Sequence, residues 1–202
     1  MVGLSYAFAM QWLSGVCPMH RFKFDLMFVV LLAVCTAPAT RAEVADAEAN
    51  GFTIRHTVTI AADRQSVYKA AVANIGNWWS SDHTVSGDAA NLYLIAAIPG
   101  CFCERLGDGS GLVHLSVSFV NPGVLLRLTG GLGPLGLMGV AGNMTWEFDD
   151  ADNGTIVTLQ YAVGGYMPGG LDTVAEAVDG VLVEQMTRLA SYVETGSPVA
   201  EP

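Results

Sequence analysis

The feature that most constrains the fold is a long amphipathic helix at the C-terminal end of a chain that is otherwise made of short strands. From Leu171 to Thr195, apolar residues recur at helical spacing on one side, and the opposite side carries Glu176, Gly180 and Glu184. Because nearly the whole first side is apolar, the helix must lie across a large apolar surface. The strands before it supply that surface, so we expect an α+β fold in which a curved antiparallel sheet wraps round the last helix.

Glycine, proline and asparagine turns divide the rest of the chain into short elements. Strict alternation of apolar and polar residues from Phe52 to Ile60 predicts a half-buried strand. Asp63 is placed as the N-cap of one or two short helices that end near Trp78. Six further strands are expected, over 92–97, 101–106, 112–120, 124–129, 140–149 and 155–163. The sequence therefore predicts seven strands, two short helices after the first strand, and one domain over residues 51–195.

Residues 1–42 are typical of a secretion signal. Arg21 and Lys23 precede an apolar run from Leu26 to Val34, and small residues follow as far as Ala42. The run is short for a membrane span, so we expect cleavage after Ala42, translation from Met19, and a periplasmic or secreted protein. An uncleaved signal anchor and a lipoprotein modified at Cys35 are the alternatives. Residues 43–50 are interpreted as a linker and residues 196–202 as a flexible tail.

The formal net charge of −10 excludes several classes of partner. Phosphate backbones and anionic lipid headgroups would both be repelled, so we expect no nucleic acid and no electrostatic membrane docking. Transient membrane contact through apolar loops stays open, and the oligomeric state is not predicted.

Metal and cofactor sites are not expected either. Cys101 and Cys103 are interpreted as two buried thiols, because two residues on one strand face are awkwardly placed for a bridge, and further metal ligands are scattered. The glycines from Gly131 to Gly136 match a dinucleotide-binding spacing. Because that segment joins two strands and contains Pro134, we expect no cofactor there.

Several motifs resemble the START-like, or SRPBCC, superfamily. They are Val67-Tyr68, Asn77-Trp78-Trp79, Ser81-Asp82-His83-Thr84, Pro99-Gly100-Cys101-Phe102-Cys103-Glu104, Leu126-Arg127-Leu128, Gly131-Leu132-Gly133-Pro134-Leu135 and the segment Tyr161 to Tyr166. The resemblance covers about residues 51–194. That superfamily includes polyketide cyclases, lipid-transfer proteins, chaperone activators and proteins of the birch-pollen allergen type. The resemblance implies a helix-grip fold with an internal apolar cavity, and it implies no single activity, because the fold hosts binders, carriers and enzymes.

The candidate ligand-binding residues are aromatic or imidazole side chains, together with two leucines of a glycine-rich loop. They are His56, Trp78, Trp79, His83, Tyr93, Leu132, Leu135, Trp146, Tyr161 and Tyr166. The competing interpretation is structural: the aromatic residues pack in the core, and His56 and Tyr161 bond to backbone groups. His83 and Asp82 could likewise satisfy their own loop.

Three other polar residues are interpreted as surface groups. His114 alternates with serines and is expected to face solvent, and Glu104 and Arg127 are expected to pair on the sheet surface. Strand direction places the loops 130–139 and 164–170 at one end of the sheet, where we expect the entrance to the cavity.

Few ionisable residues converge, so we expect a binding or carrier protein for a small hydrophobic molecule, lipid-like or aromatic, rather than an enzyme. The alternative is an enzyme of cyclase or dehydratase type that uses the same cavity. No catalytic residue is predicted.

Overall fold

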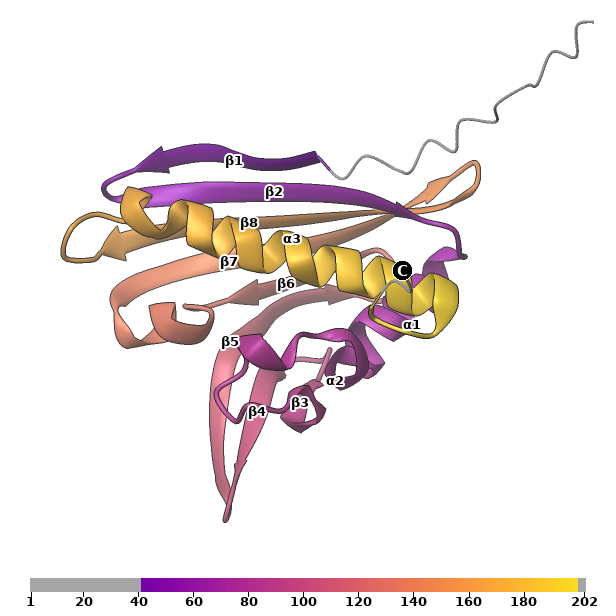
Figure 1. Cartoon of the computed structure of the whole chain (residues 1–202), viewed down its shortest axis with the longest axis horizontal. Coiled ribbons are helices and arrows are strands. Elements are labelled where there is room, and N and C mark those ends of the chain that lie inside the picture. Colours follow the sequence, from indigo (N-terminus) through magenta and orange to yellow (C-terminus); the bar gives the residue numbers. More distant parts are fainter. Residues whose placement is uncertain (1–40, 200–202) are drawn as a thin grey trace, which may run out of the picture. The chain divides into compact units, whose positions relative to one another are not determined.

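The computed structural model describes residues 41–199, and within them eight strands form one antiparallel sheet. The strands are β1 Arg41–Glu48, β2 Gly51–Ile60, β3 Leu92–Leu94, β4 Cys101–Gly107, β5 Ser110–Asn121, β6 Leu125–Thr129, β7 Gly139–Ala151 and β8 Gly154–Tyr166. Their order across the sheet is β1-β2-β8-β7-β6-β5-β4-β3 (Figure 1). Strands β3 to β8 thus form a meander, and the β1–β2 hairpin joins it along β8.

The prediction of seven strands was wrong by one, because residues 43–50 do not form a linker. Residues 41–48 form the edge strand β1, which pairs with β2 from Arg41 opposite Thr57 to Glu48 opposite Gly51. The strand is rich in alanine and acidic residues, which are uncommon in strands. Val44 packs partly against the core, whereas residues 45–48 are exposed, so main-chain pairing rather than burial holds β1 in place.

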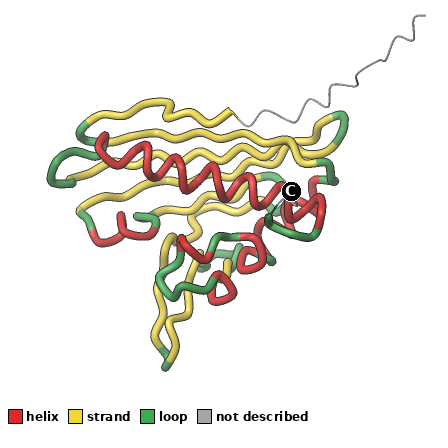
Figure 2. Tube along the Cα trace, in the orientation of Figure 1, coloured by secondary structure: helices red, strands yellow, loops and turns green. Residues whose placement is uncertain are grey.

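The helices are α1 Arg64–Ala73, α2 Ile75–Trp78 and α3 Asp172–Thr195, with single helical turns η1 Ser81–His83, η2 Ala89–Asn91 and η3 Gly133–Leu137 (Figure 2). Asp63 caps α1 as predicted, because its Oδ1 accepts a hydrogen bond of 3.0 Å from the Ser66 backbone N–H. The long terminal helix was also predicted correctly. It ends at Gly196, whose φ of 80° is favourable for glycine.

Helix α3 lies along β2 and contacts α1 and α2 (Figure 1). Its buried residues Leu182, Met186 and Leu189 belong to the same core cluster as the inward-facing residues of β2, which confirms the α+β class with a long helix packed on the sheet. Two polar residues of α3 hold the chain that follows α2. Gln185 Oε1 accepts a hydrogen bond of 2.8 Å from the Ser80 N–H, and Arg188 Nε donates one of 2.8 Å to the Trp78 carbonyl.

The expected signal sequence lies outside the described residues as far as residue 40, and Arg41 and Ala42 begin β1. Within residues 41–199, no helix is long and apolar enough to cross a membrane. At the other end, the Ser191 hydroxyl donates a hydrogen bond of 2.8 Å to the Ser197 carbonyl, so the chain folds back on α3 after Gly196.

The interpretation of Cys101 and Cys103 as free thiols was wrong, because they form a disulfide. The strand is irregular between Phe102 and Cys103, where the pairing with β5 shifts register. The two Cα atoms lie 5.5 Å apart, closer than the spacing of a regular strand and well within the range of disulfides.

Candidate functional site

An apolar cavity of about 390 Å³ lies between α3 and the β4–β5 part of the sheet. Its walls come from residues 79–85 around η1, from β4 and β5, from residues 132–138 around η3, and from α3. The α3 residues that line it are Val174, Ala177, Val178 and Val181, which share one side of the helix. Ligand pockets in proteins have this size and this apolar character, so the cavity is the candidate functional site.

The exposure of the lining residues distinguishes the mouth of the cavity from its floor. The exposed lining residues are Asp82, Val85, Pro134, Met138 and Ala177, so the mouth lies between the η1 segment, the η3 segment and α3. The buried ones are Trp79, Phe102, His114 and Leu135, which form the floor. The Phe102 ring lies 5.2 Å from that of Trp79 and 5.1 Å from that of His114, centroid to centroid. The floor is therefore an aromatic surface that carries one imidazole.

That imidazole is paired with a buried carboxylate. His114 Nε2 lies 2.9 Å from Glu104 Oε2, and the side chain of Glu104 has no exposed surface. The carboxylate also accepts hydrogen bonds from the backbone N–H groups of Val85 and Ser86. Glu104 therefore connects the loop at the cavity mouth to the histidine on its floor.

The expectation that His114 faces solvent was wrong, because a β-bulge interrupts the alternation of β5. Phe102 pairs with Leu115 and Cys103 pairs with Val113, so His114 is the additional residue with no partner on β4. A bulge of this kind lets two successive side chains lie on the same side of the sheet. His114 and Leu115 are accordingly both buried, and the bulge is what directs the imidazole toward the cavity.

The expected surface pair of Glu104 and Arg127 was wrong for a related reason. Glu104 lies on the inner side with His114, whereas Arg127 is exposed and donates a hydrogen bond of 3.2 Å from Nε to Thr145 Oγ1.

Burial by itself would raise the pKa of Glu104. The hydrogen bonds from Ser86, Val85 and His114 outweigh burial and hold that pKa below its usual value of 4.5. The carboxyl group is therefore ionised at neutral pH.

A second histidine and carboxylate meet at the mouth. His83 Nε2 lies 3.0 Å from Glu184 Oε2, and this contact joins η1 to α3 beside the opening. Both side chains are partly exposed, at 31% and 41%. The pair therefore helps to hold one edge of the mouth in place.

Four of the ten predicted ligand-binding residues line the cavity: Trp79, His83, Leu132 and Leu135. Trp78 and Trp146 are buried in the core, where their rings lie 6.1 Å apart. Tyr93 is covered by the Arg105 guanidinium, 4.3 Å from the ring centroid. Trp78, Tyr93 and Trp146 therefore have structural positions outside the cavity wall.

Tyr161 and His56 are buried elsewhere. The Tyr161 hydroxyl donates a hydrogen bond of 3.0 Å to the Gly130 carbonyl and accepts one of 2.9 Å from the Leu132 N–H, so Tyr161 holds the segment before η3. Burial raises the pKa of Tyr161. His56 Nε2 lies 2.9 Å from Asp179 Oδ1 of α3, close but poorly aligned for a hydrogen bond. Burial lowers the pKa of His56, although Asp179 opposes that effect.

Of the two loops predicted to form the entrance, one lines the cavity and the other does not. Leu132, Leu135 and Met138 of the first loop line the cavity, whereas Tyr166 and Met167 do not. The reason is that β8 continues to Tyr166, which pairs with Gly139 and leaves its side chain 73% exposed. Residues 82–85 take the place of that second loop at the mouth.

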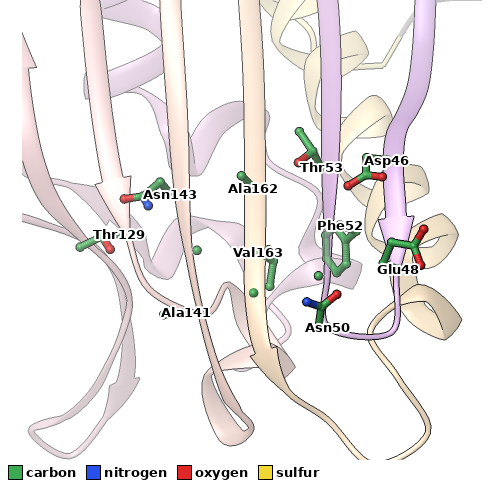
Figure 3. A pocket seen from close by; sticks show the side chains of 13 residues that line it. Asp46, Glu48, Asn50, Phe52, Thr53, Thr129, Ala141, Asn143, Ala162 and Val163 are labelled. Atoms are coloured by element: carbon green, nitrogen blue, oxygen red, sulfur yellow. The ribbon is translucent and has the colours of Figure 1, made fainter.

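A second hollow lies on the outer face of the sheet, opposite α3 (Figure 3). A row of cross-strand neighbours lines it, in the order Asp46, Thr53, Ala162, Asn143 and Thr129. A second row contains Glu48, Gly51, Gly164 and Ala141, and the two glycines and the alanine leave the depression unfilled. Because it is open and polar, it does not compete with the cavity as a site for an apolar molecule. No group of three or more metal-ligating side chains occurs in residues 41–199.

No family model matches the chain, and no curated protein sequence does. Solved structures share its fold. CalU16 from Micromonospora echinospora gives a TM-score of 0.54 at 14% identity, over 80% of this chain and 87% of that one. A conserved protein of unknown function from Enterococcus faecalis gives 0.52 at 14% identity, over 82% and 80%.

DynU16, a protein from the dynemicin biosynthetic locus, gives a TM-score of 0.50 at 21% identity, over 72% of this chain and 48% of that one. At these identities the likeness concerns the fold alone. It is consistent with the SRPBCC-like, helix-grip arrangement of a sheet and a long terminal helix.

Proposed function

We propose that this protein binds one small, mainly apolar molecule in the cavity between α3 and the sheet. The observation that carries the proposal is the cavity of about 390 Å³, with valines of α3 on one side and an aromatic floor on the other. The free energy falls when an apolar molecule replaces water against apolar walls. At the mouth His83 is engaged with Glu184 and Thr84 with the Ser81 carbonyl, and the interior behind them is apolar, so it selects for an apolar body.

The comparisons support a small organic molecule as the ligand. CalU16 and DynU16 share the fold, and DynU16 belongs to a locus for the biosynthesis of dynemicin. The link to a biosynthetic locus supports a small organic molecule as the ligand, and we carry over no activity from either protein.

We also propose that the protein is exported. This proposal rests on the order of basic residues, an apolar run and small residues in the sequence up to Ala42. Cleavage there would leave β1 from Glu43, still paired with β2. Cell fractionation followed by N-terminal sequencing tests this. A mature N-terminus near Glu43 outside the cytoplasm supports export, and full-length protein in the cytosol contradicts it.

Titration with the apolar fluorescent dye Nile red tests the cavity. Val181 lines the cavity and Val183, on the same helix, does not. We expect Val181→Phe to fill part of the cavity and weaken dye binding by about tenfold or more, the effect of losing roughly 1.4 kcal/mol. Val183→Phe is the matched control and should bind the dye as the wild type does. Equal affinities for both variants would exclude this cavity as the binding site.

A second candidate function, an enzyme of cyclase type, is favoured by the Glu104–His114 pair on the cavity floor. A histidine oriented by a carboxylate is a common general base. In such a reaction His114 would take a proton from a carbon next to a carbonyl group, leaving an enolate that can attack a second carbonyl in the same molecule.

The first of these steps can be measured alone. With 2-acetylnaphthalene in deuterated water, His114 would remove a methyl proton and the solvent would return a deuteron. We expect the wild type to accelerate this exchange above the rate in buffer and His114→Phe not to do so. If the ketone binds but its methyl protons exchange with deuterium no faster than in buffer alone, the enzymatic function is excluded and the binding function stands.

A further inference from the structure

We propose that the cavity recognises molecules that carry one hydroxyl donor, such as a phenol or an enol, and that His114 Nδ1 accepts the hydrogen bond from it. This inference rests on the proposed binding function and names the class of ligand: a flat apolar body with an acidic O–H at its inner end. It goes beyond apolar binding, because it predicts which end of the bound molecule lies deepest in the cavity.

The hydrogen bonds of Glu104 determine which nitrogen of His114 carries the proton. Both carboxylate oxygens accept from backbone N–H groups, Oε2 from Val85 and Oε1 from Ser86. A backbone N–H can only donate, so this arrangement is the one that suits an ionised carboxylate. An ionised carboxylate can only accept from His114, and the proton of the neutral imidazole therefore lies on Nε2. Nδ1 then has a lone pair and acts as an acceptor.

His114 Nδ1 is also a buried polar atom without a partner. In residues 41–199, buried side-chain nitrogen and oxygen atoms that lack a hydrogen bond occur on His56, His114 and Asp179. Of these residues only His114 lines the cavity. A buried acceptor without a donor costs about 1–3 kcal/mol, and a ligand hydroxyl would recover part of that cost. Less than 1 Å² of Nδ1 itself is exposed, so a ligand contacts it only when the ring or its neighbours move.

The other polar side chains of the cavity wall are exposed or partly exposed, so water competes with a ligand hydroxyl for them. His83 Nε2 is occupied by Glu184, and the Thr84 hydroxyl donates a hydrogen bond of 2.8 Å to the Ser81 carbonyl. Asp82 is exposed at the mouth, where water competes for it. A ligand hydroxyl therefore has its best dry partner on the floor, beside Phe102.

The test compares two probes of nearly the same shape, 2-naphthol and 2-methoxynaphthalene, of which only the first has an O–H donor. We expect the wild type to bind 2-naphthol about tenfold more tightly, the effect of one hydrogen bond made in a dry site. His114→Phe should bind both probes alike. His56→Leu replaces a buried histidine that does not line the cavity and is the matched control, in which the preference for 2-naphthol should persist.

A second measurement needs no variant and no ligand. Long-range proton–nitrogen NMR spectra of the wild type at neutral pH report which ring nitrogen of His114 is protonated. We expect the proton on Nε2. This measurement stands even if His114→Phe fails to fold.

Each outcome supports or overturns the inference. A preference for 2-naphthol that His114→Phe abolishes and His56→Leu retains supports it. Equal binding of the two probes by the wild type, a preference that survives in His114→Phe, or a proton on Nδ1 overturns it and leaves apolar binding intact. If neither probe binds and Nile red does not bind, the proposed function fails as well.

Discussion

Replacing Tyr161 by phenylalanine should release the loop that forms one wall of the cavity. The Tyr161 hydroxyl makes two hydrogen bonds to that loop, one to the Gly130 carbonyl and one from the Leu132 N–H. The ring itself is fully buried, and phenylalanine would fill almost the same space. The substitution therefore removes the tether and leaves the packing in place.

The size of the effect follows from what each partner loses. Gly130 O keeps the hydrogen bond of 3.0 Å from the Gly142 N–H, whereas none is found for the Leu132 N–H apart from Tyr161. Two hydrogen bonds of about 1 kcal/mol each give a loss of about 2 kcal/mol in the free energy of unfolding. For a domain of this size the corresponding fall in Tm is about 4–8 °C.

Urea unfolding gives the free energy, and hydrogen exchange at the Leu132 amide gives the local effect. We expect faster exchange at Leu132 and faster release of bound Nile red. Tyr166→Phe is the matched control, because that side chain is 73% exposed and no hydrogen bond to its hydroxyl is found; its stability should change by less than about 0.5 kcal/mol. If Tyr161→Phe is as stable as the control and exchange at Leu132 is unchanged, the hydroxyl does not hold the loop.

Four further outcomes follow from the structure. The pKa of Glu104 is lower in the folded protein than its usual 4.5, so the unfolded chain takes up the proton first as the pH falls. The stability that the ionised carboxylate contributes is therefore present above pH 4.5 and lost below it. In urea unfolding at acid pH, the free energy of unfolding should decline less steeply in Glu104→Gln than in the wild type. The pKa of His56 is also lowered in the folded protein, so the unfolded chain takes up the proton first and stability should decline as the pH falls below 6.5. Urea unfolding on either side of that pH should show a smaller loss of unfolding free energy in His56→Leu than in the wild type. Because Cys101 and Cys103 are bridged, thiol titration of the unfolded chain should detect these two cysteines only after reduction. Replacing both with serine should lower the free energy of unfolding by about 1–2 kcal/mol, a small effect because the bridge closes a very short loop. Leu137 and Tyr166 have side chains that are 92% and 73% exposed, so they are the candidates for a membrane contact. If the apolar loops contact membranes, the double variant Leu137→Ser with Tyr166→Ser should reduce the fraction of protein that sediments with zwitterionic vesicles. An unchanged fraction would exclude these two side chains as the contact.

Regular periodicity made most of the fold predictable. The apolar side of residues 171–195 and the alternation from Phe52 to Ile60 are direct consequences of burial against one core, and both elements were found with nearly the predicted bounds. Strand β1 lacks that signal because only its backbone is needed for pairing. The pair Asn50-Gly51, which is common where a chain reverses, could have indicated the hairpin between β1 and β2.

The most informative part of the site could not be predicted, because it depends on an irregularity. A strict alternation places His114 on the solvent side with the serines of β5, and only the register shift against β4 turns it inward. The same shift falls between Cys101 and Cys103, whose Cα atoms lie 5.5 Å apart, close enough to bridge. Register shifts depend on how two strands pair, which one strand's sequence does not specify. Trp79 and His83 were found at the cavity because they lie in the segment that α3 holds through Gln185 and Arg188.

The most direct test of the account is to locate a bound molecule by NMR. Protein with labelled leucine and valine methyl groups is mixed with 2-naphthol, and nuclear Overhauser contacts between the probe and the methyl groups are recorded. We expect contacts to Leu135 on the cavity floor and to Val181 on the α3 wall, at a stoichiometry of one to one. Contacts confined to Val163, which borders the outer hollow, or no contacts at any concentration that dissolves, would contradict the claim that this cavity is the binding site.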